Sequence, residues 1–321
     1  MTTLLKVLED NNNMRLDVVA ARMFSDYSRT QLKKWILQGR VLVNGDICQP
    51  KDSVYEGDEI EIHPLKEIKV SWDPEKIEFE VCYEEEDFLI INKPFGLVMH
   101  PGSGCYNGTL ANGLLYKYPE LINLPRSGIV HRLDKDTSGV LVVAKTESFR
   151  NYFIQEMQER KVIKKYIAIS VGDTIGSFEI NEPLGRDSKN RTKMAIRSDG
   201  KESISFVKLI SKSNGYAILD VLIETGRTHQ IRVHLASKNL PIIGDSTYNT
   251  RKKIAKNTSP ELIKYIREFP RQALHAAHLS FFHPTSNELF EWLIPMPVSY
   301  THLRAHETLM NLVCRLLLEK T

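Results

Sequence analysis

The apolar residues of the first quarter of the chain recur at helical spacing. A first helix is predicted from Met14, with an apolar stripe made of Leu16, Val19, Ala20 and Met23. Ser28 is placed as the N-cap of a second helix, Gln31 as its capping-box partner, and Gly39 as its end. The buried stripe of this second helix is Leu32, Trp35 and Ile36. We therefore expect two short helices that pack through these stripes.

Strand patterns follow the two helices. The dipeptide Asn44-Gly45 lies between two apolar runs, and it accepts the positive φ angles of a tight turn, so it predicts a hairpin. Residues 59–62 alternate between glutamate and isoleucine, which is typical of a half-buried strand. Residues 14–64 are thus predicted to form a small α/β module, which an N-terminal segment, residues 1–13, precedes.

Residues 65–77 lose clear periodicity and contain Pro74, so we place a linker there. Beyond it, strand patterns outnumber helical ones and often follow one another directly. The predicted strands are 79–83, 88–92, 128–131, 140–144, 166–171, 203–209 and 216–224, and the predicted helices are 149–159, 230–237 and 261–269. This order predicts an α+β catalytic domain over residues 78–297, with a mixed, largely antiparallel sheet and flanking helices.

Composition adds little that is specific. The chain has 321 residues, of which 42% are hydrophobic and 26% charged, as in an ordinary globular protein of two domains. The N-terminus lacks a signal-peptide pattern and no long apolar run is present, so we expect a cytoplasmic protein without a membrane partner. No exposed heptad pattern is seen, which favours a monomer. A net charge of +3 does not by itself indicate nucleic acid.

The densest polar cluster, His131-Arg-Leu-Asp-Lys-Asp-Thr-Ser-Gly139, lies between two apolar strands, and this placement indicates a site. Asp134 has neighbouring cations and hydroxyl groups that favour its charged form. An ionised aspartate can act as a nucleophile or as a base. Asp136 is more typical of a local turn, in which the carboxylate accepts backbone amides. Spacing alone does not choose between the two aspartates.

A second polar cluster, residues 224–234, runs from a strand through Gly226 into a helix. Helix starts attract anions through their free amides, and Arg227 adds a fixed cation there. Arg232 and His234 lie on different sides of this helix, so we do not expect both in one pocket. Packing or capping also accounts for His229 and His234.

No metal or cofactor site is predicted. His275 and His278 could meet on a helix, but no third ligand is evident. The phosphate-binding pattern Gly-x-x-x-x-Gly-Lys-Ser/Thr is missing as well. The four cysteines, Cys48, Cys82, Cys105 and Cys314, are too widely spaced to suggest a zinc site or a disulfide framework.

Three long motifs occur in a fixed order. They are Asn92-Lys-Pro-Phe-Gly-Leu-Val-Met-His-Pro-Gly102, residues 131–139, and residues 226–234, and the last is followed by Leu240-Pro-Ile-Ile-Gly-Asp245 and Tyr248. Together they resemble the RluA-like family of pseudouridine synthases. In the first module, Ser28-Arg29 and Gly39-Arg-Val-Leu-Val-Asn-Gly45 resemble the small RNA-binding module of a small-subunit ribosomal protein and of tyrosyl-tRNA synthetases. The resemblance covers residues 14 to 297.

The resemblance implies a role for five residues of the larger domain. It makes Asp134 the catalytic carboxylate and Tyr166 the ring that packs on the target uracil. It also implies that Arg227 pairs with Asp134, that Ile231 lines the uracil pocket, and that Arg132 helps to replace the extruded base. Without the resemblance, Tyr166 would be read as a core tyrosine of its strand.

In the first module, charge alone predicts a solvated helix face for four cations: Arg29, Lys33, Lys34 and Arg40. The resemblance implies instead that they contact RNA phosphates, which supply affinity without reading sequence.

The resemblance implies isomerisation of uridine to pseudouridine in RNA, a reaction without redox change that requires no cofactor. Large-subunit ribosomal RNA is the expected substrate, with transfer RNA as an alternative. Two other functions fit the residues: a nucleoside or glycoside hydrolase that uses Asp134 and Asp136, and an RNA-binding or ribosome-assembly protein without activity. Residues 298–321 differ from the acidic helical C-terminus that is usual in the family. They suggest either non-native sequence or a variable C-terminal helix, and we assign them no function.

Overall fold

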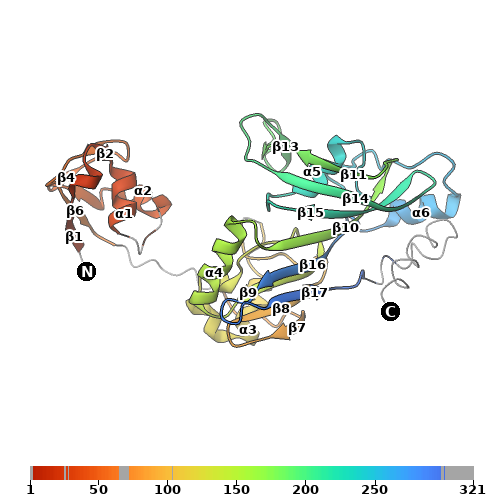
Figure 1. Ribbon diagram of the computed structural model, residues 1–321, viewed down its shortest axis with the longest axis horizontal. Coiled ribbons are helices and arrows are strands. Elements are labelled where there is room, and N and C mark those ends of the chain that lie inside the picture. Colours follow the sequence, from red (N-terminus) through yellow and green to blue (C-terminus); the bar gives the residue numbers. More distant parts are fainter. Residues whose placement is uncertain are drawn as a thin grey trace. The chain divides into compact units, whose positions relative to one another are not determined.

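The structure is a computed structural model that describes residues 3–24, 27, 29–64, 72–102, 104–297 and 300. The chain divides into two compact units, Met1–Ser71 and Trp72–Thr321 (Figure 1). Each unit has its own hydrophobic core. They are therefore described one at a time.

The first unit is a small sheet covered by two helices. The strands of the sheet are ordered β1 (Thr3–Lys6), β6 (Glu59–Ile62), β3 (Val41–Val43) and β4 (Asp46–Ile47), and β2 (Met14–Arg15) pairs separately with β5 (Ser53–Val54). The helices are α1 (Leu16–Met23) and α2 (Arg29–Leu37), and a short 3-10 turn, η1 (Glu9–Asn11), precedes them. Both predicted stripes face this core, which buries Leu16, Val19, Leu32, Trp35 and Ile36.

The predicted hairpin joins β3 to β4. Asn44 and Gly45 have φ angles of 52° and 87°, as the turn type requires. The N-cap predicted at Ser28 lies outside the described residues. The predicted separate segment 1–13 needs correction, because Thr3–Lys6 pairs with β6 along its whole length and so belongs to this unit. Its side chains are exposed, and an exposed edge strand leaves little apolar pattern in the sequence.

The buried carboxylate of Asp17 ties the two helices of this unit together. Its oxygens accept hydrogen bonds from Arg15 at 3.0 Å and from Arg29 at 2.8 Å. Burial alone would raise the pKa of Asp17, but the two guanidinium groups outweigh it and hold this pKa below its ordinary value. Arg29 therefore has a structural partner inside the unit, although 56% of its side chain is exposed.

Acidification is expected to weaken this unit through Asp17. Because the folded-state pKa is lowered, the unfolded chain binds the proton first. The stabilisation is therefore complete above about pH 5 and is lost as the pH falls through the folded-state pKa. Asp17→Asn should remove about 1–2 kcal/mol at pH 7, since both arginines remain exposed to water. Hydrogen exchange of peptides from residues 16–37 measures this loss, with peptides of the second unit as internal control. Equal protection in wild type and variant at pH 7 would contradict it.

The second unit is built on one nine-stranded sheet. Its strands lie in the order β11 (Ser177–Asn181), β14 (Ile204–Ser213), β15 (Tyr216–Ile223), β10 (Ile163–Val171), β16 (Leu274–Phe282), β9 (Ser138–Ala144), β8 (Phe88–Lys93) and β7 (Glu80–Glu84), and β17 (Leu289–Leu293) also pairs with β16. The pairing of β16 with β9 is parallel, and the other strand pairs of this sheet are antiparallel. A separate hairpin is formed by β12 (Leu184–Arg186) and β13 (Met194–Ile196).

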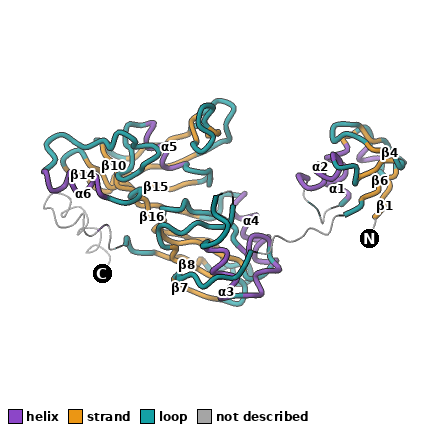
Figure 2. The backbone as a smooth tube through the Cα atoms, turned by 180° about the vertical axis from the view of Figure 1, so that it is seen from behind, coloured by secondary structure: helices purple, strands orange, loops and turns teal. Residues whose placement is uncertain are grey.

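The helices are divided between the two halves of this sheet. In both views α3 (Leu110–Lys117) and α4 (Glu147–Gln158) lie beside the half that contains β7 to β9, whereas α5 (Gln230–Ser237) and α6 (Pro260–Glu268) lie beside the half that contains β14 and β15 (Figures 1 and 2). Two 3-10 turns, η2 (Pro119–Asn123) and η3 (Pro125–Gly128), follow α3. An aromatic cluster of Phe88, Phe149, Phe153 and Phe281 joins α4 to the sheet. The predicted α+β fold class is confirmed.

Two local predictions in this unit were wrong. Residues 128–131 do not form a strand: the chain leaves η3 with Arg126 and Ser127 at positive φ and makes only an isolated bridge from Ile129 to Val143. His275 and His278 lie on the strand β16 instead of a helix. Burial on both faces of a strand gives a continuous apolar run, which periodicity does not distinguish from a buried helix.

Trp72 to Ile77, predicted as the end of a linker, belong to the second unit. Trp72 and Ile77 pack on its core, and the carbonyl of Asp73 accepts a hydrogen bond from Asn112 of α3. Long-range contacts of this kind hold an extended segment without any periodic pattern of its own. The other predicted linker residues, 65–71, lie outside the described part of the chain.

Gly139 permits the close approach of the parallel strands β9 and β16. Its φ is 116°, and a Cβ atom there would lie 2.1 Å from the carbonyl oxygen of Ala276. A side chain is therefore excluded at this point. The contact fixes where the polar loop 131–137 enters β9, and so positions the site described next.

Candidate active site

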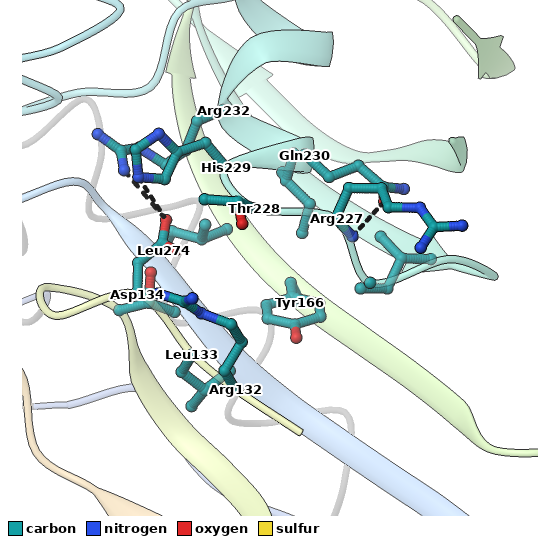
Figure 3. A pocket seen from close by; sticks show the side chains of 14 residues that line it. Arg132, Leu133, Asp134, Tyr166, Arg227, Thr228, His229, Gln230, Arg232 and Leu274 are labelled. Carbon is teal, nitrogen blue, oxygen red and sulfur yellow. Dashed lines mark hydrogen bonds and ion pairs between the residues drawn. The ribbon is translucent and has the colours of Figure 1, made fainter. Parts of the chain in front are cut away.

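A pocket lies at the middle of the large sheet, where several elements meet (Figure 3). Asp134 comes from the loop before β9, Tyr166 from β10, Leu274 from the start of β16, and residues 226–232 from the turn into α5. Its empty volume, including the open mouth, is about 450 Å³. The two polar clusters of the sequence are thus brought to opposite walls of one pocket.

Asp134 is the carboxylate of this pocket, and 16% of its side chain is exposed. Its Oδ2 accepts a hydrogen bond of 3.0 Å from Nη1 of Arg232, and Nε2 of His229 lies 3.9 Å away. Both partners come from the start of α5, three positions apart on one helix face. The carboxylate therefore meets a fixed cation on one side and the open pocket on the other.

Arg232 is held in place by a second carboxylate, that of Asp245. Nε and Nη2 of Arg232 donate to the two oxygens of Asp245 at 2.7 and 2.9 Å, a bidentate pair. Asp245 also accepts the backbone amides of Thr247 and Tyr248, and the Tyr248 ring lies against the guanidinium, 5.1 Å away. Burial opposes both charges, but their attraction outweighs it, so the pKa of Arg232 is raised and that of Asp245 is lowered. The arginine is thus charged and immobile.

The expected pairing of Arg227 with Asp134 is corrected by this geometry. Arg227 is exposed, its Nε donates to the carbonyl of Glu202 at 3.1 Å, and its side chain lies across the pocket from Asp134 (Figure 3). The reason is where α5 begins: Arg227 precedes the helix in the turn, whereas Arg232 lies on the helix face toward the polar loop. Arg232 takes the role that the resemblance gave to Arg227.

The turn from β15 into α5 is fixed by Gln230. Its Oε1 accepts hydrogen bonds from the Thr225 hydroxyl and the Arg227 amide, and its Nε2 donates to Ile204 and Ser205 of β14. All of these contacts are 2.8 to 3.0 Å long. His229 at the helix start has a positive φ of 56°. This network determines where α5 begins, and therefore which arginine reaches Asp134.

Tyr166 and Ile231 form apolar walls of the pocket and are 7% and 5% exposed. Burial and the charge of Asp134 raise the pKa of Tyr166 well above its ordinary value, so the phenol stays neutral. A neutral ring and a branched aliphatic side chain suit the flat faces of a nucleobase. The structure therefore brings both predicted residues to the same pocket as Asp134, and places exposed Arg132 at its edge.

The loop that carries Asp134 is anchored at both ends. Nε2 of His131 accepts the backbone amide of Val142 at 2.8 Å, which requires a neutral ring, and burial with the nearby charge of Lys164 lowers the pKa of His131 to about 3. Thr137 donates its amide to the carbonyl of Asp134, closing the turn. The loop thus holds Asp134 at a fixed place.

Lys93 of the Asn-Lys-Pro motif is buried beneath this loop. Its Nζ donates to the carbonyls of Pro94, Leu97 and Lys135 at 2.8 to 3.0 Å. Burial lowers its pKa to about 7, although the carboxylates of Asp136 and Asp134 act in the opposite direction. Asp136 therefore contributes to the electrostatics around Lys93. The turn in this loop is closed by the backbone carbonyl of Asp134, which accepts the Thr137 amide.

The two histidines considered as metal ligands have other partners. Nδ1 of His275 lies 3.0 Å from the Ser138 hydroxyl, and Nε2 of His278 lies 2.6 Å from Glu291. No cluster of three or more potential ligands occurs in the described ranges. No helix in these ranges has the length and apolar content that a membrane crossing requires.

Comparisons with known proteins agree with the site. The profile of the RNA pseudouridylate synthase family matches residues 87–237, and that of the S4 domain matches residues 14–60. Fold and site therefore define an RNA-modifying isomerase of the pseudouridine synthase class.

Individual relatives extend this match to most of the chain. Ribosomal large subunit pseudouridine synthase D of Pasteurella multocida is 43% identical over 290 residues, 90% of either chain, and that of Escherichia coli is 41% identical over 298 residues, 92% of this chain and 91% of the relative. The solved structure of human RNA pseudouridylate synthase domain containing 1 is 26% identical, with a TM-score of 0.54 over 76% of this chain and 96% of that one. The chain belongs to the RluA-like pseudouridine synthases with an N-terminal S4 domain.

Sequence reasoning missed part of the site. It gave no role in the site to His229, for which packing or capping was an alternative, it placed Arg232 only apart from His234, and it gave Asp245 no role. The spacing of His229 and Arg232 on one predicted helix face was a usable signal, since it predicts two cationic or polar groups on one side. The partnership with Asp245 had no local signal, because it depends on how the chain returns after α5. His234 does lie apart, bonded to Ser205 and Glu182.

Proposed function

We propose that this enzyme isomerises uridines of large-subunit ribosomal RNA to pseudouridine, with Asp134 as the catalytic carboxylate. The observation that carries the proposal is the chain Asp134–Arg232–Asp245, which holds one carboxylate in place at the edge of a pocket walled by Tyr166 and Ile231. The relatives named above support large-subunit ribosomal RNA as the substrate.

The reaction breaks the bond from the ribose to N1 of uracil, turns the base in the pocket, and joins C5 to the ribose. A carboxylate such as Asp134 can attack the sugar or remove a sugar proton. The hydrogen bond from Arg232 holds the carboxylate in a fixed orientation for either route. Tyr166 and Ile231 hold the released base between apolar walls, so that it is not lost before it is rejoined.

The target base must first leave its stack, which costs a few kcal/mol. Tyr166 offsets part of this cost by packing on the extruded base, and Arg132, exposed at the pocket edge, fills the space that the base leaves in the RNA. In the S4 domain, Lys33 and Lys34 are exposed and Arg40 is half-buried, and with Arg29 they contact RNA phosphates. The enzyme acts as a monomer in the cytoplasm, where ribosomal RNA is found.

The test is incubation of the protein with unmodified large-subunit ribosomal RNA that carries tritium at C5 of uracil. We expect tritium release, because C5 exchanges its hydrogen for the ribose, and we expect no free uracil. Transfer RNA labelled in the same way serves as the comparison substrate. Free uracil would instead indicate a hydrolase, and RNA binding without either product, on naked RNA and on assembled particles, would indicate a binding protein without activity.

A further inference from the structure

A second cavity adjoins the uracil pocket on the other side of Tyr166. The two share Arg132, Tyr166, Ile223 and Gly226 as lining residues, and the second has an empty volume of about 800 Å³ with its open part. Its charged lining residues are the cations Arg126, Arg132 and Lys164, and no carboxylate lines it. Two histidines, His100 and His131, also line it, and burial lowers the pKa of both. The absence of a carboxylate contrasts with the uracil pocket, where Asp134 balances the arginines.

Lys164 is the buried cation of this cavity. It lies two positions before Tyr166 on β10, so both side chains point to the same face of the sheet, and only 5% of Lys164 is exposed. Within the described part of the chain its Nζ has one hydrogen-bond partner, the sulfur of Met157 at 3.4 Å, which is a weak acceptor. Burial lowers the pKa of Lys164 to about 8, and no nearby acid raises it. A buried ammonium without a counter-charge costs stability and favours an anion.

A histidine that lines the same cavity also lacks a partner. Nδ1 of His100 is buried and has no hydrogen-bond partner among the described residues, and its ring is stacked on Trp72 at 6.0 Å. Arg126 and Arg132 are exposed and line the same cavity. The backbone of Arg126 has a positive φ of 57° within η3, and its side chain lines the cavity. The cavity thus combines a buried cation, a ring nitrogen without a partner among the described residues, and two exposed guanidinium groups.

We propose that this cavity binds a phosphate group of the RNA strand next to the extruded uridine, with Lys164 as its central ligand. The proposal rests on the proposed function for its RNA substrate. Because Tyr166 and Arg132 are common to both cavities, a strand whose uracil occupies the first passes directly over the second. A lysine binds phosphate as a point charge, and the arginines at the rim close on the same group. The charge that is unbalanced in the free protein is balanced only when RNA is bound.

The test compares Lys164→Met, Lys164→Arg and a matched control, Lys165→Met, which changes the neighbouring lysine on the opposite face of the same strand. Each is made in an Asp134→Asn background to measure RNA affinity without turnover, and in the active protein to measure kcat and KM. For Lys164→Met we expect about 10- to 100-fold weaker binding of the ribosomal RNA fragment. The slope of log Kd against log salt should fall by about 0.7, the value for one phosphate contact of a single strand.

Four further results separate binding from packing. The Tm of Lys164→Met should equal or exceed that of wild type, because an unpaired buried charge is removed. Lys164→Arg should keep most of the affinity, and Lys165→Met should behave as wild type. In the active protein, Lys164→Met should raise KM more than it lowers kcat.

The proposal is overturned if Lys164→Met binds RNA with wild-type affinity and salt slope. It is also overturned if Lys164→Met and Lys164→Arg lose affinity equally together with a lower Tm, which would show a packing role. These outcomes are distinct from failure of the proposed function, which would appear as a wild-type protein that forms no pseudouridine whatever the state of Lys164.

Discussion

Asp134→Asn is expected to reduce pseudouridine formation by about 10⁴-fold or more, since it removes the group that attacks the sugar or its proton. The amide keeps the shape of the side chain, and Arg232 keeps its bidentate pair with Asp245, so the fold should lose no more than about 1 kcal/mol. RNA affinity should change little. Tritium release under single-turnover conditions measures the loss, and thermal unfolding checks the fold.

Asp136→Asn is the matched control for this experiment, because it changes a carboxylate two positions away in the same loop. Asp136 does not line the uracil pocket, so the activity of Asp136→Asn should stay within a few-fold of that of wild type. If Asp136→Asn abolished tritium release and Asp134→Asn did not, the assignment of the two carboxylates would be reversed. Loss of activity in both would point to paired carboxylates, as in a hydrolase.

Arg232→Met is expected to destabilise the second unit by about 3–5 kcal/mol and to suppress activity as well. The stability is lost because Asp245, whose side chain is 1% exposed, is left as a buried charge without its cation. The activity is lost because Asp134 loses the hydrogen bond that orients it. Urea unfolding of the full chain and tritium release measure the two effects separately.

Two companion variants isolate the causes. Arg232→Met combined with Asp245→Asn should recover most of the stability, since no charge remains buried, but not the activity. Arg227→Met should leave stability near that of wild type, because the Arg227 side chain is exposed and, within the described residues, hydrogen-bonds only to the backbone carbonyl of Glu202. Arg227→Met with a larger loss of activity than Arg232→Met would contradict the pairing seen in the structure and support the pairing that the family resemblance implied.

Many elements of the fold could be predicted, because turn residues, caps and apolar periodicity mark them locally in the sequence. The helix at residues 230–237 was predicted with the bounds that the structure gives, and the Asn44-Gly45 hairpin lies where its turn chemistry places it. The predictions lack α3, β11, β12, β13, β16 and β17. Three other exceptions share one cause. Thr3–Lys6, Trp72–Ile77 and residues 128–131 owe their conformation to distant partners, and the sequence around them has no periodic signal of those contacts.

The site was predictable in its parts but not in its connections. The family resemblance gave roles to Asp134, Tyr166 and Ile231, which lie in separate segments of the sequence, and the structure brings all three to one pocket. It did not predict that Arg232 bonds Asp134, because the two residues are 98 positions apart and their meeting depends on the start of α5. Family resemblance assigned this role to Arg227, three positions before the helix begins.

By itself the sequence therefore determined many of the elements and the two-part organisation, because turn residues, caps and apolar periods act over a few positions. The choice of Asp134 over Asp136 and the role of Tyr166 came from the family resemblance. Only the tertiary structure decided which arginine holds Asp134, that Asp245 holds this arginine, and that Lys164 is buried in a cavity without a carboxylate. Such outcomes depend on distances and burial between segments that are far apart in the chain. Those quantities exist only after the sheet has brought the segments together.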